Sequence, residues 1–255
     1  GGGRDGAGGD GRNMGMPKSH DTPLWQPSPE RIAAANLTAF MAEIRRRWDA
    51  KVHDYAGLHR WSVAEPQKFW RSVWSFAGVI AETEGSAVLR DGHLMLDAQW
   101  FPEARLNFAQ NLLRRRDGTP AIVFRGETGL RQELSHAELY NLVSRLVQAL
   151  RAAGVRRGDR IAAWLPNIPA SITVLLACAS VGAVFSSCSP DFGVQGVCDR
   201  FGQIAPRLLF AVDGYFYGGA AIDCTRRLRE IAESLPSVER VVVVPYAGTG
   251  EAVAG

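Results

Sequence analysis

The sequence contains very little lysine. Of its 29 basic residues only Lys18, Lys51 and Lys68 are lysines, and the other twenty-six are arginines. Chemistry that needs a lysine ammonium or a lysine Schiff base after residue 68 is therefore excluded within these 255 residues.

Cysteine is also sparse, and its spacing excludes the common metal and redox motifs. The four cysteines form no CxxC pair and show no metal-ligand spacing with the five histidines. All four lie among apolar or small residues: Cys178, Cys188, Cys198 and Cys224. We predict buried free thiols, no metal site and a cytoplasmic protein, because free thiols persist in reducing compartments.

The chain lacks an apolar run long enough for a membrane span. The most apolar stretch, from Ile172 to Phe185, has fourteen residues, whereas a spanning helix needs about 20. The glycine-rich start has no apolar core of a signal peptide, so we predict a disordered leader over residues 1–24. Translation could then begin at Met14 or Met16.

Charge of one sign is not concentrated anywhere. The net charge is +3, and the arginine pairs and triplets are scattered near expected helix ends and turns. A nucleic-acid partner is therefore not expected, because such binders carry a clustered basic face. The phosphate-loop motif GxxxxGK[ST], the dinucleotide motif GxGxxG after a strand and the nucleophile motif GxSxG are missing too.

Tryptophan, in contrast, is abundant in the first part of the chain. Six of the seven tryptophans lie at or before Trp100, and composition changes near residue 118. We predict a Trp-rich helical segment over residues 25–118, with aromatic stripes used for packing. Three helices are expected: from the cap at Ser28 to Trp48, from Pro66 to Gly78, and from Pro102 to Arg116 with Leu106, Ala109, Leu112 and Leu113 inward.

From Pro120 onward, strand-like and helix-like segments alternate. A hairpin is expected around Glu127 and Gly129, and Ser135 with Glu138 forms a capping box before a helix that ends at Gly154. Further strands are expected at residues 160–165, 183–186, 207–212 and 239–244, with helices at 170–181, 194–204 and 223–235. This order predicts an α/β domain over residues 119–255 with a parallel, doubly wound sheet.

The serine-rich stretch after the apolar run invites a catalytic interpretation. Ser186, Ser187, Cys188 and Ser189 precede Asp191, and one histidine, His136, belongs to the α/β part. No glycine pair forms the sharp turn that exposes a nucleophile. We favour a structural role, with Asp191 near the start of the next helix.

Several blocks in the right order resemble one enzyme superfamily. The segments Arg60–Trp70, Phe101–Leu113 and Gly154–Gly193 are similar to blocks of acetyl-CoA synthetases and their relatives, the adenylate-forming ligases. The variants FSSCSPDFG and GYFYGG resemble acetoacetate–CoA ligases more than acetate–CoA ligases. The resemblance implies the N-terminal portion of the AMP-binding domain of such an enzyme.

The resemblance implies a two-step ligase reaction. A carboxylate attacks ATP to give an acyl-adenylate and pyrophosphate, and CoA then displaces AMP; acetoacetate, ATP and CoA are the implied small-molecule substrates, with Mg²⁺ as the metal. The family's phosphate loop would follow the strand at residues 239–244, and its catalytic lysines would also lie downstream. No catalytic and no metal-binding residue is therefore expected in this chain. We predict an N-terminal fragment that is inactive alone and binds no cofactor tightly.

One family site could be partly present. In acetyl-CoA synthetase-like enzymes a short glycine-containing segment contacts the nucleotide part of CoA, and its counterpart here includes Tyr217, Gly218 and Gly219. The family's basic residue is replaced by Ala220 or Ala221, so a plain tight turn is the alternative.

Two other functions stay open on sequence alone. An acetyl- or propionyl-CoA synthetase would carry similar blocks, because the acid pocket that distinguishes them lies outside this sequence. A non-catalytic flavodoxin-like binding module would show the same alternation of strands and helices.

Overall fold

The computed structural model describes residues 23–248, so the predicted leader over residues 1–24 lies almost wholly outside the described part. The chain forms two compact units that divide between Ala77 and Gly78. The composition change that suggested a division after residue 118 lies inside the second unit. Each unit is described separately.

The first unit is a small cluster of helices. Its elements are α1 (Pro29–Ala33), α2 (Asn36–Trp48), α3 (Tyr55–Ala64) and α4 (Pro66–Ala77). Phe40, Ile44, Val52 and Leu58 form its buried centre, and the rings of Trp48, Trp61 and Phe69 pack against them. The aromatic stripes thus serve packing, as predicted.

Two helices of this unit differ from the prediction. The expected helix from Ser28 to Trp48 is interrupted between α1 and α2, where the Thr38 hydroxyl donates to the Ile32 carbonyl at 2.6 Å. Helix α3 was not predicted. Its N-cap is Asp54, whose carboxylate accepts a hydrogen bond from the Gly57 N–H at 2.6 Å.

The start of the second unit is mostly irregular. It contains two short antiparallel strands, β1 (Leu89–Arg90) and β2 (Gln99–Trp100), and one short helix, α5 (Phe108–Leu112). The prediction of a helix from Pro102 to Arg116 was therefore wrong for most of its length. Ala109 and Leu113 are buried as expected, but Leu106 and Leu112 are about half exposed. Leu106 precedes the short helix α5, so it does not share the inward face of that helix.

The remainder of this unit is an α/β structure that follows the prediction closely. A β3–β4 hairpin precedes α6, which begins at the predicted capping box of Ser135 and Glu138. The elements in order are β3 (Pro120–Arg125), β4 (Arg131–Ser135), α6 (His136–Ala152), β5 (Arg160–Trp164), α7 (Pro169–Val181), β6 (Val184–Cys188), α8 (Val194–Gly202), β7 (Leu208–Val212), β8 (Gly214–Tyr217), β9 (Ala220–Asp223), α9 (Thr225–Ser234) and β10 (Arg240–Val244).

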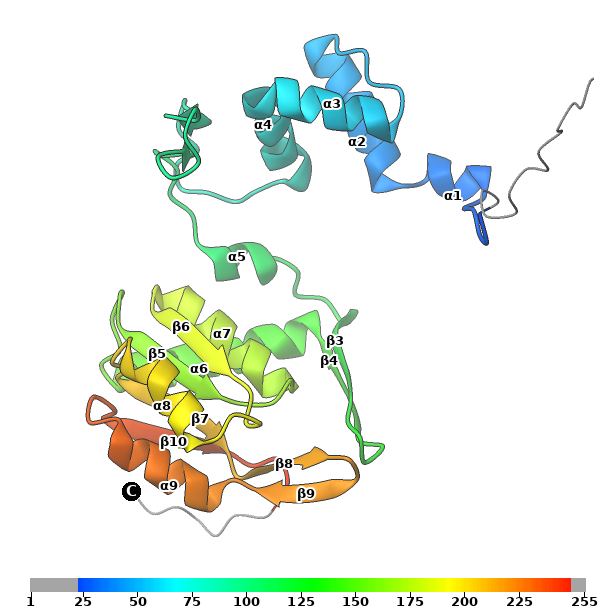
Figure 1. The fold of residues 1–255 in the computed structure, drawn as a ribbon. Helices are drawn as coiled ribbons and strands as arrows, with labels where there is room; N and C mark the ends of the chain where they lie inside the picture. Colours follow the sequence, from blue (N-terminus) through cyan, green and yellow to red (C-terminus); the bar gives the residue numbers. More distant parts are fainter. Residues whose placement is uncertain (1–22, 249–255) are drawn as a thin grey trace, which may run out of the picture. The chain divides into compact units, whose positions relative to one another are not determined.

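Four parallel strands form the central sheet in the order β10-β7-β5-β6 (Figure 1). The chain moves outward from β5 to β6 and then back through β7 to β10. Right-handed crossovers therefore place α7 on one face and α8 and α9 on the other. Helix α6 packs on α7, and α8 packs on α9. The doubly wound parallel sheet predicted from the sequence is confirmed.

The sheet is most deeply buried along its two central strands. All five residues of β7 are buried, as are the last four of β5, which matches their uninterrupted apolar sequences. The outer strands β6 and β10 are half exposed. Among residues 23–248, no strand pairs with the outer edge of β10.

Candidate functional site

The carboxyl edge of the parallel sheet is the candidate site. Trp164, the last residue of β5, stands in register with Cys188 of β6 and Ala211 of β7, so these strands end at one edge. The connections leave β5 and β7 in opposite directions, and ligands of open α/β sheets bind in the crevice at such a switch point.

The serine-rich loop after β6 is a tight, braced turn at this edge. The Ser189 hydroxyl donates to the Asp191 carboxylate at 2.8 Å, and the Asp191 N–H donates back to that hydroxyl. The Arg227 guanidinium of α9 donates to the Pro190 carbonyl at 3.2 Å and lies 5.3 Å from the centre of the Trp164 ring. These contacts fix the course of the loop.

The geometry supports a structural role for this loop. Burial raises the pKa of the Cys188 thiol to about 11, so the thiol is protonated and weakly nucleophilic at neutral pH. The Ser189 hydroxyl is engaged with Asp191, and no histidine is its partner. His136 stands at the start of α6, where its N–H donates to the Thr119 carbonyl.

The predicted CoA contact lies at the tip of the β8–β9 hairpin. Tyr217 ends β8, and Gly218 and Gly219 form the two-residue turn with φ of 59° and 81°. Two consecutive positive φ angles define the turn type that favours glycine in hairpins. The Tyr217 side chain is 66% exposed, so its ring is available to a flat ligand such as a purine.

The charge near this tip differs from what a phosphate group requires. The Gly219 N–H lies 3.5 Å from a carboxylate oxygen of Glu127, at the tip of the β3–β4 hairpin. A carboxylate there repels phosphate, and the residues after the glycines are Ala220 and Ala221. The tip therefore suits the base or ribose of a nucleotide better than its phosphates.

Sequence reasoning missed Asp213, the most engaged side chain at this edge. Asp213 lies between β7 and β8 and is only 6% exposed, yet its carboxylate accepts N–H groups from Tyr246, Ala247 and Gly248 at 2.7, 3.0 and 2.8 Å. Burial raises the pKa of this carboxyl, but these N–H donors outweigh burial and lower it below its ordinary value. A lone aspartate directly after a fully apolar strand was the available signal.

The segment after β10 is also held by aromatic rings. The Tyr246 ring meets Phe124 of β3 and Phe216 of β8 edge-on, at centroid distances of 6.3 and 5.5 Å. Tyr246 thereby lies between the two hairpins of the α/β part.

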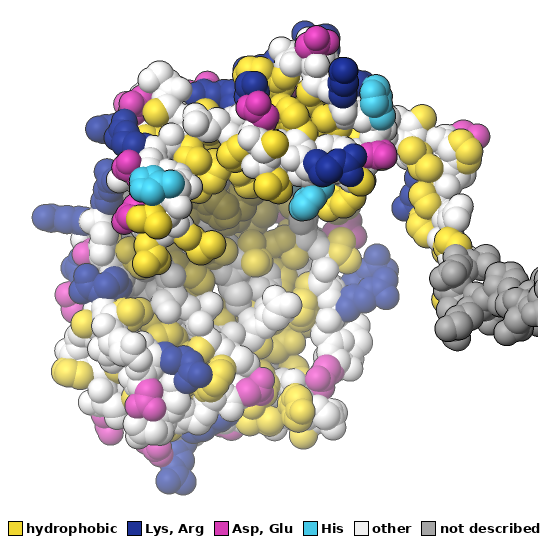
Figure 2. Space-filling view, turned by 45° about the horizontal axis from the view of Figure 1, so that its top comes forward, with side chains coloured by type: hydrophobic (Ala, Val, Ile, Leu, Met, Phe, Trp, Pro, Cys, Tyr) yellow, Lys and Arg dark blue, Asp and Glu magenta, His cyan; other side chains and the backbone are white. Residues whose placement is uncertain are grey.

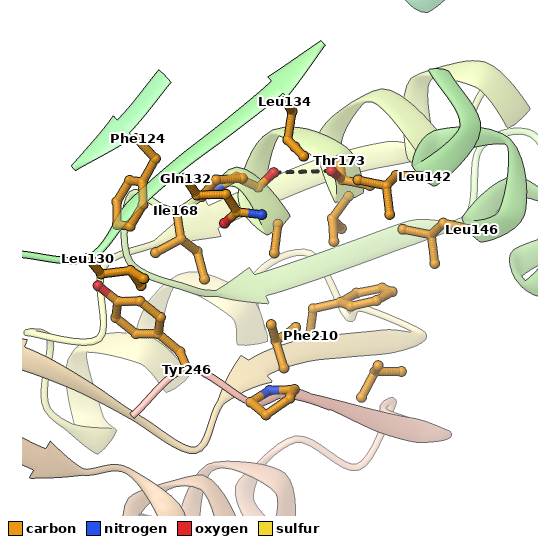
Figure 3. A pocket seen from close by; sticks show the side chains of 16 residues that line it. Phe124, Leu130, Gln132, Leu134, Leu142, Leu146, Ile168, Thr173, Phe210 and Tyr246 are labelled. Atoms are coloured by element: carbon orange, nitrogen blue, oxygen red, sulfur yellow. Dashed lines mark hydrogen bonds between the residues drawn. The ribbon is translucent and has the colours of Figure 1, made fainter. Parts of the chain in front are cut away.

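An apolar cavity of about 410 Å³ opens beside Tyr246 (Figure 3). Its polar side chains include Gln132 and Thr173, and the Thr173 hydroxyl donates to the Pro169 carbonyl at 3.1 Å. The apolar lining comes from β3, β4, α6, α7, β7 and β10 and includes Leu134, Leu142, Leu146, Ile168, Phe210 and Val242.

Charge and metal-ligand chemistry add little to this site. On the face drawn in Figure 2, Lys and Arg side chains are separated by acidic and apolar ones and form no single basic patch. Among residues 23–248, no three His, Cys, Asp or Glu side chains gather so that they could hold a metal ion, and no helix is long and apolar enough to cross a bilayer.

Two family models match the chain. The model of the AMP-binding enzyme family matches residues 108–253, and that of the acetyl-coenzyme A synthetase N-terminus matches residues 55–112. The chain therefore belongs to the AMP-binding enzyme family.

Several similar proteins are named acetoacetyl-CoA synthetases. An acetoacetyl-coenzyme A synthetase of Rhizobium meliloti is 49% identical over 92% of this chain, and an acetoacetyl-CoA synthetase of Macaca fascicularis is 33% identical over 90%. A solved structure, the acetoacetyl-CoA synthetase from Streptomyces lividans, is 43% identical over 91% of this chain with a TM-score of 0.85. The fold prediction and the resemblance are confirmed. The chain spans about a third of each relative's length: 36%, 34% and 36%, respectively.

Proposed function

We propose that the chain is the N-terminal part of an acetoacetate–CoA ligase, which converts acetoacetate, ATP and CoA into acetoacetyl-CoA, AMP and pyrophosphate. The supporting observation is the 49% identity over 92% of this chain to an acetoacetyl-coenzyme A synthetase. The match of residues 55–112 to the acetyl-coenzyme A synthetase N-terminus agrees with an N-terminal position.

Within the complete reaction, this chain supplies a scaffold and one edge of the CoA site. Tyr217, Gly218 and Gly219 contact the nucleotide part of CoA, with the exposed Tyr217 ring against the base. Because Glu127 lies at the same tip, the phosphates of CoA point away from this hairpin. Magnesium belongs to the complete enzyme. The described residues contain no cluster of His, Cys, Asp or Glu side chains that could hold it, so we assign no magnesium ligand to them.

The thiols favour a cytoplasmic site of action. All four cysteines are free, and burial raises the pKa of Cys178 to about 12 and that of Cys224 to about 11. Such thiols remain reduced in the cytoplasm, which agrees with a cytoplasmic site of action.

The test compares the 255-residue chain with the product of its complete reading frame. The complete product is expected to release pyrophosphate from ATP when acetoacetate is added, and to do so better than with acetate or propionate. The 255-residue chain is expected to release no pyrophosphate above a blank without protein. It has no lysine after Lys68 that could stabilise the negative charge that develops on the α-phosphate of ATP. A preference for acetate or propionate would assign the alternative acyl substrate, and activity of the short chain would contradict the scaffold role.

The CoA contact has its own test. Tyr217→Ala in the complete product should raise the KM for CoA, because a stacked base loses its partner, while the KM for ATP stays unchanged. Tyr55→Ala, which removes a similarly exposed ring from the helical unit, is the matched control. An unchanged KM for CoA would remove Tyr217 from the CoA site.

A further inference from the structure

The carboxylate of Asp213 holds the segment that follows β10. Its Oδ1 accepts hydrogen bonds from the N–H groups of Gly214, Tyr246 and Ala247, and its Oδ2 accepts one from Gly248. Successive N–H groups that converge in this way form an anion-binding nest. Here the nest is filled by a carboxylate from the same chain.

The backbone groups of Asp213 also form hydrogen bonds to neighbouring elements at this edge. Its N–H lies 3.4 Å from the Val244 carbonyl at the end of β10, and its carbonyl accepts the Cys224 N–H at the start of α9 at 2.8 Å. One residue therefore joins the end of β7, the end of β10 and the start of α9. All three meet at the carboxyl edge, where ligands of such sheets bind.

We propose that Asp213 is a positioning residue that sets the direction in which the chain leaves β10 across the ligand-binding edge. In the proposed ligase, this segment leads into the ATP-binding part of the complete protein, and Asp213 fixes the position at which that part begins. This role toward ATP rests on the proposed function. The charge of the carboxylate is required, because a neutral side chain cannot accept from all four N–H groups.

The first experiment measures amide hydrogen exchange in the 255-residue chain. Asp213→Asn keeps the shape of the side chain but places an amide NH₂ where Oδ2 was, opposite the Gly248 N–H. Exchange should therefore rise by about tenfold or more at Gly248, less at Tyr246 and Ala247, and not at all in β5. Tyr246→Phe, which keeps the ring and the N–H, is the matched control and should leave these rates unchanged.

The second experiment restores the missing anion. Asp213→Ala should expose the nest and raise exchange at all of residues 246–248, and added formate should lower that exchange again toward the wild-type rates. Formate should have no such effect on Asp199→Ala, which removes an exposed aspartate of α8. A segment held only by its aromatic ring would keep wild-type exchange in both Asp213 variants, and that result would overturn the proposal.

The third experiment separates this inference from the proposed function. In the product of the complete reading frame, Asp213→Asn should raise the KM for ATP by about tenfold and leave the KM for acetoacetate nearly unchanged. Equal losses for both substrates, or no change in either KM, would show that Asp213 does not position the ATP-binding part. A wild-type product without ligase activity would overturn the proposed function and the ATP step together, while the exchange measurements would still decide whether Asp213 holds the segment.

Discussion

At the scale of single residues, Arg207 links three parts of the chain by ion pairs and a hydrogen bond to backbone. Arg207 lies at the amino edge of the sheet, where its guanidinium bonds Asp159 at 3.0 Å, Glu239 at 2.8 Å and the Gly154 carbonyl at 2.7 Å. These contacts join the turn before β5, the start of β7 and the start of β10.

The Asp159 carboxylate should make stability depend on acid. Its pKa is lowered from 3.8, first by the Arg156 N–H and then by Arg207, so its stabilisation is complete above pH 3.8 and is lost as the pH falls below it. Asp159→Asn should cost about 1 kcal/mol of unfolding free energy at neutral pH and progressively less below pH 3.8. Urea unfolding at several pH values measures this difference in unfolding free energy. A difference that is the same at every pH would show that the charge of Asp159 does not cause it.

At the scale of elements, a block that resembles the ligases turns out to serve packing. Asn107 caps α5 by accepting the Gln110 N–H, and its amide donates to the Ala179 carbonyl at the end of α7 at 2.9 Å. Asn111, one turn later, bonds both the N–H and the carbonyl of Ile80. Asn107 therefore attaches the irregular segment to α7, and Asn111 holds the segment together internally.

Asn107→Ala should therefore loosen that segment. The loss of a cap and of a bond to a helix end should cost about 1–2 kcal/mol and increase amide exchange over residues 80–113. Asn141→Ala, on the exposed side of α6, is the control and should neither lower the unfolding free energy nor increase exchange over residues 80–113, because alanine favours a helix interior more than asparagine does. Equal effects of the two substitutions would show that the segment is held by apolar contacts instead.

The elements also show where sequence reasoning succeeds. Helices α6 to α9 and the strands of the central sheet were predicted because apolar residues repeat with a clear period and caps mark their ends, as Ser135 and Glu138 do for α6. The short strands β8 and β9 on either side of the glycine turn were not predicted. The structure of residues 78–118 was not predicted correctly, because it depends on hydrogen bonds from side chains to distant backbone groups, such as the bond between Asn111 and Ile80. Of the site, the glycine tip was visible in the sequence, whereas Asp213 acts through main-chain groups of residues that are far away in sequence.

At the scale of the whole chain, the outer edge of β10 is unpaired among the described residues. None of the described strands covers this edge, and the apolar cavity lies beside it, with Val242 of β10 39% exposed. Unpaired edges flanked by apolar surface pair readily with other chains.

The 255-residue chain is accordingly expected to self-associate at high concentration. Val242→Lys should reduce this association, because a charged side chain at the centre of an edge strand opposes pairing. Val63→Lys, at an exposed valine of α3, should not. Sedimentation velocity over a range of concentrations measures the effect, and an unchanged wild-type sedimentation coefficient at all concentrations would contradict it.

The contacts of Asp213 with residues 246–248 have a consequence for how this segment can change in evolution. All of these bonds come from main-chain N–H groups, which every residue except proline possesses. Substitutions at Ala247 can therefore accumulate while the anchor persists, provided that none introduces proline. This freedom is specific to Ala247, because Tyr246 is also held by its ring contacts with Phe124 and Phe216 and Gly248 has a φ of 67° that favours glycine.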